Sequence, residues 1–113
     1  MTTGIRVAAV EDIAIGEGLA ISSEVTGTED DIALLRDDDG TVYALNDTCT
    51  HAVASLSDGW VEGGYVECPV HASRFCLKNG KVSGPPATVD TVGHRVEVRD
   101  GDVYLFPGES PEA

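Results

Sequence analysis

The sequence has no apolar run long enough to cross a membrane. Uninterrupted apolar stretches in its 113 residues are short, as at 32–35, whereas a membrane helix needs about 20 such residues. The first 20 residues also lack the basic start and apolar block of an export signal. We therefore expect a soluble protein of the cytoplasm that has no membrane partner.

Basic residues are scarce as well. The chain has 7 Lys and Arg against 20 Asp and Glu, which gives a net charge of −13. Nucleic acid is a poor partner for such a chain, because phosphate binding needs a basic face. Two alternatives remain for the acidic charge: it serves only solubility, or it steers the protein to basic patches on partner proteins.

Cysteine is rare, with three residues at Cys49, Cys68 and Cys76. An odd number of cysteines without an export signal argues against disulfides and for metal binding. Cys76 lies between Phe75 and Leu77 and is expected to be a small, buried side chain that binds no metal.

No ten-residue stretch shows helical periodicity either. A single helical turn, for instance near 10–13, is too short for this pattern to reveal. Short strands separated by Gly-containing turns dominate instead, which predicts an all-β fold with one domain over residues 1–113. The predicted strands are 6–10, 19–25, 32–36, 41–46, 60–61, 65–67, 75–77, 81–82, 95–99 and 102–106.

Two short motifs interrupt this strand pattern. They read Cys49-Thr50-His51 and Cys68-Pro69-Val70-His71, with 16 residues between His51 and Cys68. Thiolate and imidazole together favour zinc, copper or iron–sulfur centres. A zinc finger usually places both cysteines in one loop and both histidines in another, whereas here each loop has one of each. That arrangement suits a two-iron core with sulfur donors on one iron and nitrogen donors on the other.

This motif resembles the cluster-binding signature of Rieske proteins. The surrounding sequence resembles the Rieske ferredoxins of bacterial ring-hydroxylating dioxygenase systems, on the residues Ser57-Asp58-Gly59, Glu62-Gly63, Arg74-Phe75, Gly80-Lys81-Val82 and Pro85-Pro86-Ala87. The resemblance implies Rieske-like stacked antiparallel sheets with a small cluster-binding subdomain of two loops, at about 47–87. It also implies one [2Fe–2S] cluster bound by Cys49, His51, Cys68 and His71.

The resemblance further implies a low reduction potential. High-potential Rieske proteins join the two loops by a disulfide, but the matching positions here are Ala54 and Val70. In those proteins a Tyr hydroxyl also donates a hydrogen bond to a ligand sulfur, and the matching residue here is Phe75, which has no hydroxyl. Ser73 stands at the position of their second hydroxyl donor. Hydrogen bonds to cluster sulfur tune the potential. The segment 83–87 resembles the proline-rich loop that covers the cluster.

The chain is not expected to be an enzyme by itself. Once His51 and His71 are used as ligands, only His94 remains, so the chain cannot supply the two-His, one-carboxylate site of an oxygenase. No dinucleotide-binding motif is present either. By resemblance, the protein carries single electrons from a flavin-dependent ferredoxin reductase, which oxidises NADH or NADPH, to a terminal Rieske oxygenase that hydroxylates aromatic rings. Alternatives are a Rieske protein of iron–sulfur assembly or redox sensing, and a zinc-stabilised interaction module.

Three further expectations concern single side chains. His94 is expected in a turn or at the surface, and Trp60 in the core. Asp37, Asp38 and Asp39 are expected to form the solvated tip of a hairpin.

Overall fold

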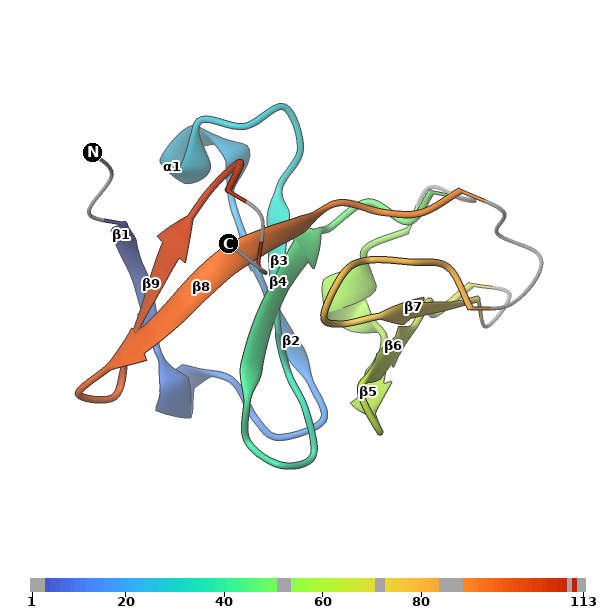
Figure 1. Ribbon diagram of the computed structural model, residues 1–113, viewed down its shortest axis with the longest axis horizontal. Helices are drawn as coiled ribbons and strands as arrows, with labels where there is room; N and C mark the ends of the chain where they lie inside the picture. Colours follow the sequence, from blue (N-terminus) through green and yellow to red (C-terminus); the bar gives the residue numbers. More distant parts are fainter. Residues whose placement is uncertain (1–3, 51–53, 71–72, 84–88, 110, 112–113) are drawn as a thin grey trace.

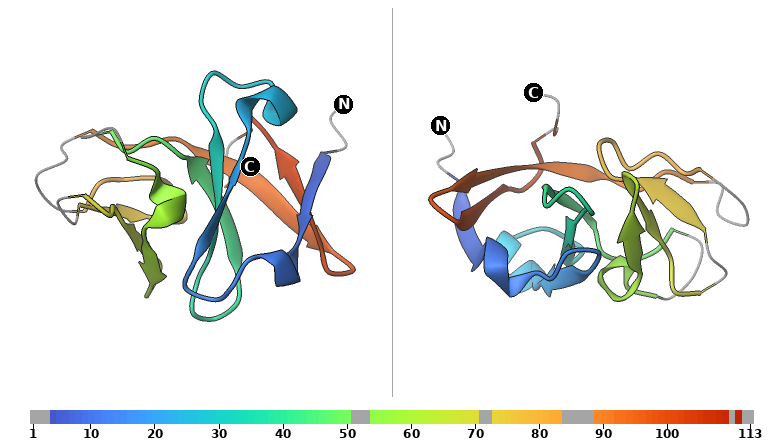
Figure 2. Two further views of the ribbon diagram at one scale, coloured as in Figure 1. Left: turned by 180° about the vertical axis from the view of Figure 1, so that it is seen from behind. Right: turned by 90° about the horizontal axis from the view of Figure 1, so that it is seen from below.

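Two antiparallel sheets make up the protein, which confirms the predicted all-β class. The computed structural model describes residues 4–50, 54–70, 73–83, 89–109 and 111 (Figure 1). Figure 2 shows the smaller sheet beside the larger one. The strand order of the larger sheet is β1 (Ile5–Ala9), β9 (Asp102–Phe106), β8 (Gly93–Arg99), β4 (Val42–Asn46), β3 (Ile32–Arg36) and β2 (Gly18–Ile21). The strand order of the smaller sheet is β5 (Trp60–Glu62), β6 (Tyr65–Glu67) and β7 (Arg74–Cys76).

Strand β3 separates two apolar cores. Its residues Ile32 and Leu34 face a core shared with β1, β4 and β9, because side chains alternate along a strand. Ala33 and Leu35 face the opposite way, into a second core that also contains Cys49 and Cys68. We call this second group the cysteine-side core; its buried members are Ala33, Leu35, Leu45, Cys49, Leu56, Val61, Val66, Cys68, Phe75 and Leu77.

The predicted strand over 19–25 is wrong beyond Ile21. The Ser22 hydroxyl oxygen accepts a hydrogen bond from the Glu24 N–H at 3.2 Å, which starts the short helix α1 (Ser23–Thr26). Gly27, at φ +75°, ends it. The helical turn considered near 10–13 corresponds to the 3₁₀ helix η1 (Val10–Asp12), and a further 3₁₀ helix, η2 (Leu56–Asp58), was not predicted.

The predicted strand at 81–82 is present only as an isolated bridge between Phe75 and Val82. In the small sheet, Val61 points into the cysteine-side core. Its neighbour Trp60 must therefore point outward, and 60% of Trp60 is exposed. The expectation of a core tryptophan is wrong for this reason. Cys76 is only half-buried, so the expected burial is partly met.

No helix in the described part of the chain is long and apolar enough to span a membrane.

Candidate metal centre

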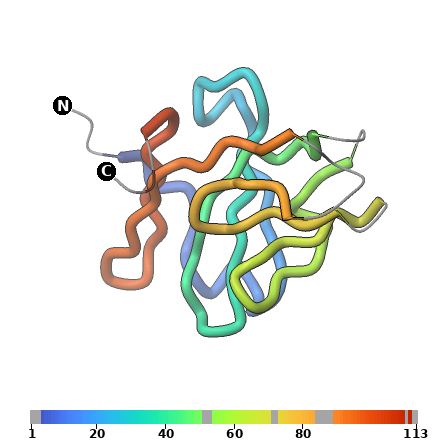
Figure 3. Tube along the Cα trace, turned by 45° about the vertical axis from the view of Figure 1, so that its right-hand side comes forward, coloured from blue at the N-terminus to red at the C-terminus, as the bar shows by residue number. Residues whose placement is uncertain are grey.

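Each cysteine of the predicted ligand set closes a loop with its own backbone N–H. The N–H of Cys49 donates to the carbonyl oxygen of Ala54 at 2.9 Å, and that of Cys68 donates to Ser73 at 2.7 Å. Each loop is thus closed by a hydrogen bond between two residues that are five apart in the sequence. The described parts of both loops lie at one end of the molecule (Figure 3). The predicted ligands His51 and His71 fall between these closing residues in sequence but lie outside the described residues.

The two thiols lie together in the cysteine-side core. Cys49 is 3% exposed and Cys68 is fully buried, and neither forms a disulfide. Burial raises the pKa of the Cys68 thiol to about 11, and a hydrogen bond with the Cys49 side chain contributes to the rise. A hydrogen bond from the backbone N–H of Val70 lowers the pKa of the Cys68 thiol, because it stabilises the thiolate.

This pair fits a metal centre. Two thiolates side by side in an apolar core are unstable without a positive charge between them, and metal ions supply that charge. The described residues contain no group of three His, Cys, Asp or Glu side chains arranged for a metal. The cysteines are therefore the half of the predicted ligand set that the structure brings together.

Two carboxylates support the first loop, and the sequence did not single them out. Asp47 is buried, and its side chain accepts a hydrogen bond at 2.9 Å from the N–H of Ser57, which lies in η2. Asp30 accepts the N–H of Thr48 at 3.1 Å and its hydroxyl at 2.8 Å. Since Asp30 is 18 residues from Thr48, no local motif could have revealed it, and both acids looked like ordinary surface charge.

The segment 89–92 connects the first loop and the turn after β7 to the large sheet, where the Val92 carbonyl accepts the N–H of Asn46 on β4 at 2.9 Å. The Thr50 hydroxyl, next to Cys49 in the chain, donates to the Val89 carbonyl at 2.6 Å. The Thr91 N–H donates to Gly80 at 2.8 Å, in the turn after β7. Gly80 is required there, because its φ is +75° and an added Cβ would lie 2.4 Å from the Thr91 oxygen. Most of the predicted covering loop, residues 84–88, lies outside the described residues.

The expected solvated tip at Asp37–Asp39 is wrong for Asp37, which is 6% exposed. Its carboxylate accepts the N–H of Gly64 at 3.2 Å, and Asp38 accepts that of Gly63 at 3.1 Å. We call these two bonds the hairpin clasp, because they join the β3–β4 turn to the β5–β6 turn. The clasp connects the large sheet to the small sheet, in which Cys68 directly follows the central strand β6.

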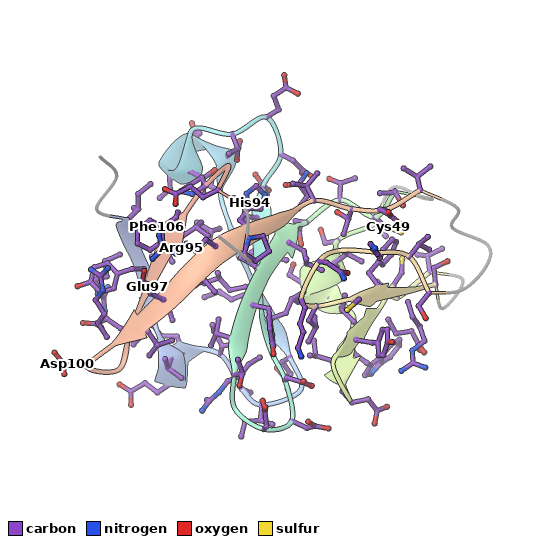
Figure 4. All side chains as sticks on the ribbon, viewed as in Figure 1. Cys49, His94, Arg95, Glu97, Asp100 and Phe106 are labelled. Atoms are coloured by element: carbon purple, nitrogen blue, oxygen red, sulfur yellow. The ribbon has the colours of Figure 1, made fainter. Side chains whose placement is uncertain are left out.

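His94 also departs from its expected surface position. It is 4% exposed on β8, away from Cys49 (Figure 4). Its Nδ1 accepts the Gly108 N–H at 2.9 Å, so Nε2 carries the proton and donates to the Asn46 side-chain oxygen at 2.7 Å. Burial lowers the pKa of His94, and the negative charge of Asp30 opposes this effect. His94 is therefore a neutral structural residue.

Comparison with known proteins agrees with this site. The family model described as "Rieske [2Fe-2S] domain" matches residues 4–107. The 3-phenylpropionate/cinnamic acid dioxygenase ferredoxin subunit of Escherichia coli (strain K12) is 41% identical over 105 residues, which are 92% of this chain and 91% of the relative.

Solved structures show the same likeness. The ferredoxin of carbazole 1,9a-dioxygenase from Nocardioides aromaticivorans IC177 matches with a TM-score of 0.82 and 29% identity, over 94% of this chain and 99% of that one. A chain in the complex of reduced oxygenase and oxidized ferredoxin in carbazole 1,9a-dioxygenase matches with a TM-score of 0.78 and 34% identity, over 90% and 100%. By the extent of these matches, this chain belongs to the Rieske [2Fe–2S] domain family, whose cofactor is one Rieske-type cluster.

Proposed function

We propose that this protein is the ferredoxin of a ring-hydroxylating dioxygenase system, an electron carrier and not a catalytic enzyme. The observation that carries the proposal is the pair of buried, unbridged thiols at the base of two equivalent loops. The relatives named as ferredoxins of dioxygenases support the carrier role over iron–sulfur assembly or sensing. The family match favours a cluster over the zinc alternative.

The proposed ligands are Cys49 and Cys68 on one iron and His51 and His71 on the other. When bound, the cluster supplies reversible one-electron transfer. The apolar side chains of the cysteine-side core keep water from the two sulfur atoms, and the Val70 N–H donates a hydrogen bond to the Cys68 sulfur. Both histidines must be neutral to bind a metal. Residues 1–113 then form one domain, with the cluster-binding part at about 47–87.

The proposed electron path has two partner proteins. A flavin-dependent ferredoxin reductase that oxidises NADH or NADPH supplies the electron, and a terminal Rieske oxygenase accepts it for the hydroxylation of an aromatic ring. The complex of oxygenase and ferredoxin in carbazole 1,9a-dioxygenase, which contains a chain similar to this one, supports the second step. All of these steps are proposed to take place in the cytoplasm.

The ligand assignment is tested with serine variants of the three cysteines. We expect Cys49→Ser and Cys68→Ser to lose the bound iron and sulfide and the EPR signal of the reduced protein. Cys76→Ser is the matched control and should keep both, because Cys76 lies outside the cysteine-side core. Replacement of His51 or His71 by Ala should also abolish the signal, and a normal signal in either variant would disprove the assignment.

The carrier role is tested separately, by turnover. The purified holoprotein, a flavin reductase and a terminal oxygenase are combined with NADH, and consumption of the aromatic substrate is measured. We expect turnover to depend on this protein and to stop when Cys68→Ser replaces it. A protein that binds the cluster but supports no turnover with the components encoded beside its gene would disprove the dioxygenase role alone.

A further inference from the structure

The outward face of the small sheet differs from an ordinary solvated strand surface. Antiparallel pairing places Trp60 opposite Glu67 and Glu67 opposite Arg74, with Glu62 opposite Tyr65 on the same face. We call these five residues the aromatic–acidic face. They line a hollow of about 230 Å³, and Trp60, the only tryptophan of the chain, is 60% exposed there.

The residue types of this face are typical of protein interfaces. Trp, Tyr and Arg are enriched among the residues that dominate binding energy at such interfaces, and Trp60, Tyr65 and Arg74 lie together here. The hollow is smaller than the 300–1,000 Å³ or so of a usual small-molecule pocket. Its size therefore suits one side chain of a partner better than a separate ligand.

The charges indicate which side chain fits. The Arg74 guanidinium already lies 5.0 Å from the centre of the Tyr65 ring, a cation–π contact. No arginine or lysine of the described residues lies over the exposed Trp60 ring, which leaves that ring for a cation of a partner. Glu62 and Glu67 form no ion pair within the described part of the chain. An arginine or lysine of a partner would find both an aromatic surface and unpaired carboxylates.

The face is also close to the proposed cluster site. The inward side chains of the same three strands, Val61, Val66 and Phe75, are buried in the core that contains Cys49 and Cys68. A protein seated on the outward face is therefore separated from the thiol pair by the thickness of one sheet.

We propose that the aromatic–acidic face is a docking surface for a redox partner protein with a basic surface. An arginine or lysine of that partner enters the hollow, stacks on Trp60 and pairs with Glu62 and Glu67. The small size of the face agrees with the small interfaces of transient redox encounters. This inference rests on the proposed electron-carrier function.

The test uses the holoprotein and cytochrome c, a basic one-electron acceptor, as the probe. Stopped-flow absorbance at low ionic strength gives the second-order rate constant of electron transfer. We expect Trp60→Ala and the double variant Glu62→Gln/Glu67→Gln each to lower this constant about fivefold. The matched control, Glu11→Gln/Asp100→Asn, removes two charges at positions outside this face, and Asp100 lies far from Cys49 (Figure 4). It should change the constant less than twofold.

A second measurement does not depend on electron transfer. The affinity of each variant for a fluorescently labelled hexa-arginine peptide is measured by polarisation, and we expect the same ranking. Equal rate constants and equal peptide affinities for Trp60→Ala, the double variant and the control would overturn the docking surface. If the wild-type protein transfers no electron to cytochrome c, the carrier function fails, and the peptide affinities still decide whether this face binds cations.

Discussion

At the scale of single residues, His94 makes stability depend on pH. Its neutral form is buried between Gly108 and Asn46, and burial lowers its pKa below the usual value of about 6.5. The unfolded chain therefore binds a proton at a higher pH than the folded one. The contribution of His94 to the free energy of unfolding is therefore complete above about pH 6.5. It is lost as the pH falls from that value through the lower pKa of His94 in the folded state.

Two measurements check this prediction. NMR titration of the His94 ring should give a midpoint below about 6.5. Urea unfolding should show that the free energy of unfolding falls between pH 7 and pH 5 more steeply in the wild type than in His94→Gln. The variant itself should be less stable by about 1–3 kcal/mol at neutral pH, because the Gly108 N–H loses its acceptor. A midpoint above the usual value would contradict the structure.

Phe75 is a second residue with a measurable consequence. It is fully buried in the cysteine-side core, at the position where high-potential Rieske proteins carry a hydroxyl donor to sulfur. We expect Phe75→Tyr to raise the reduction potential within the Rieske range of about −150 to +300 mV, because a hydrogen bond to sulfur stabilises the added electron. Protein-film voltammetry measures the shift, and Phe75→Leu is the control without a hydroxyl. An unchanged or lowered potential would argue against this role.

At the scale of elements, the hairpin clasp links the two sheets. Asp37→Ala removes the acceptor of the Gly64 N–H and, within the turn, of the Asp38 N–H. We expect a loss of about 1–3 kcal/mol in the free energy of unfolding and faster hydrogen exchange at Gly63 and Gly64. Asp39→Ala is the control, since within the described part of the chain the Asp39 carboxylate bonds inside its own turn, where it accepts the Thr41 N–H at 2.9 Å. Equal exchange rates in the two variants would mean that the clasp does not hold the turns together.

The clasp also shows what a sequence can reveal about this fold. The strands β3 and β4 are predicted to within one residue, because both are apolar runs on either side of an Asp-rich turn with Gly40. The burial of Asp37 could not be predicted, since its partner Gly64 is 27 residues away. Likewise, the proposed ligands stand out because their spacing is local, whereas the supporting contacts of Asp30, Asp47 and Val89 depend on the tertiary fold.

At the scale of the whole molecule, the net charge of −13 sets how fast partners arrive. A basic partner is attracted over a range set by the Debye length, which shortens from about 30 Å at 0.01 M ionic strength to about 8 Å at 0.15 M. We expect the rate constant of electron transfer to cytochrome c to fall about tenfold or more over this range. This effect depends on the sum of the charges, so it should persist in Trp60→Ala.

Ferricyanide gives the opposite test of the same charge. It is a small trianion, so the acidic protein repels it, and salt screens this repulsion. Its rate of reduction should therefore rise over the salt range in which the cytochrome c rate falls. Stopped-flow absorbance follows both reactions on one preparation of the reduced protein. Rates that change in the same direction with both acceptors would show that salt acts on the cluster environment and that the surface charge does not steer association.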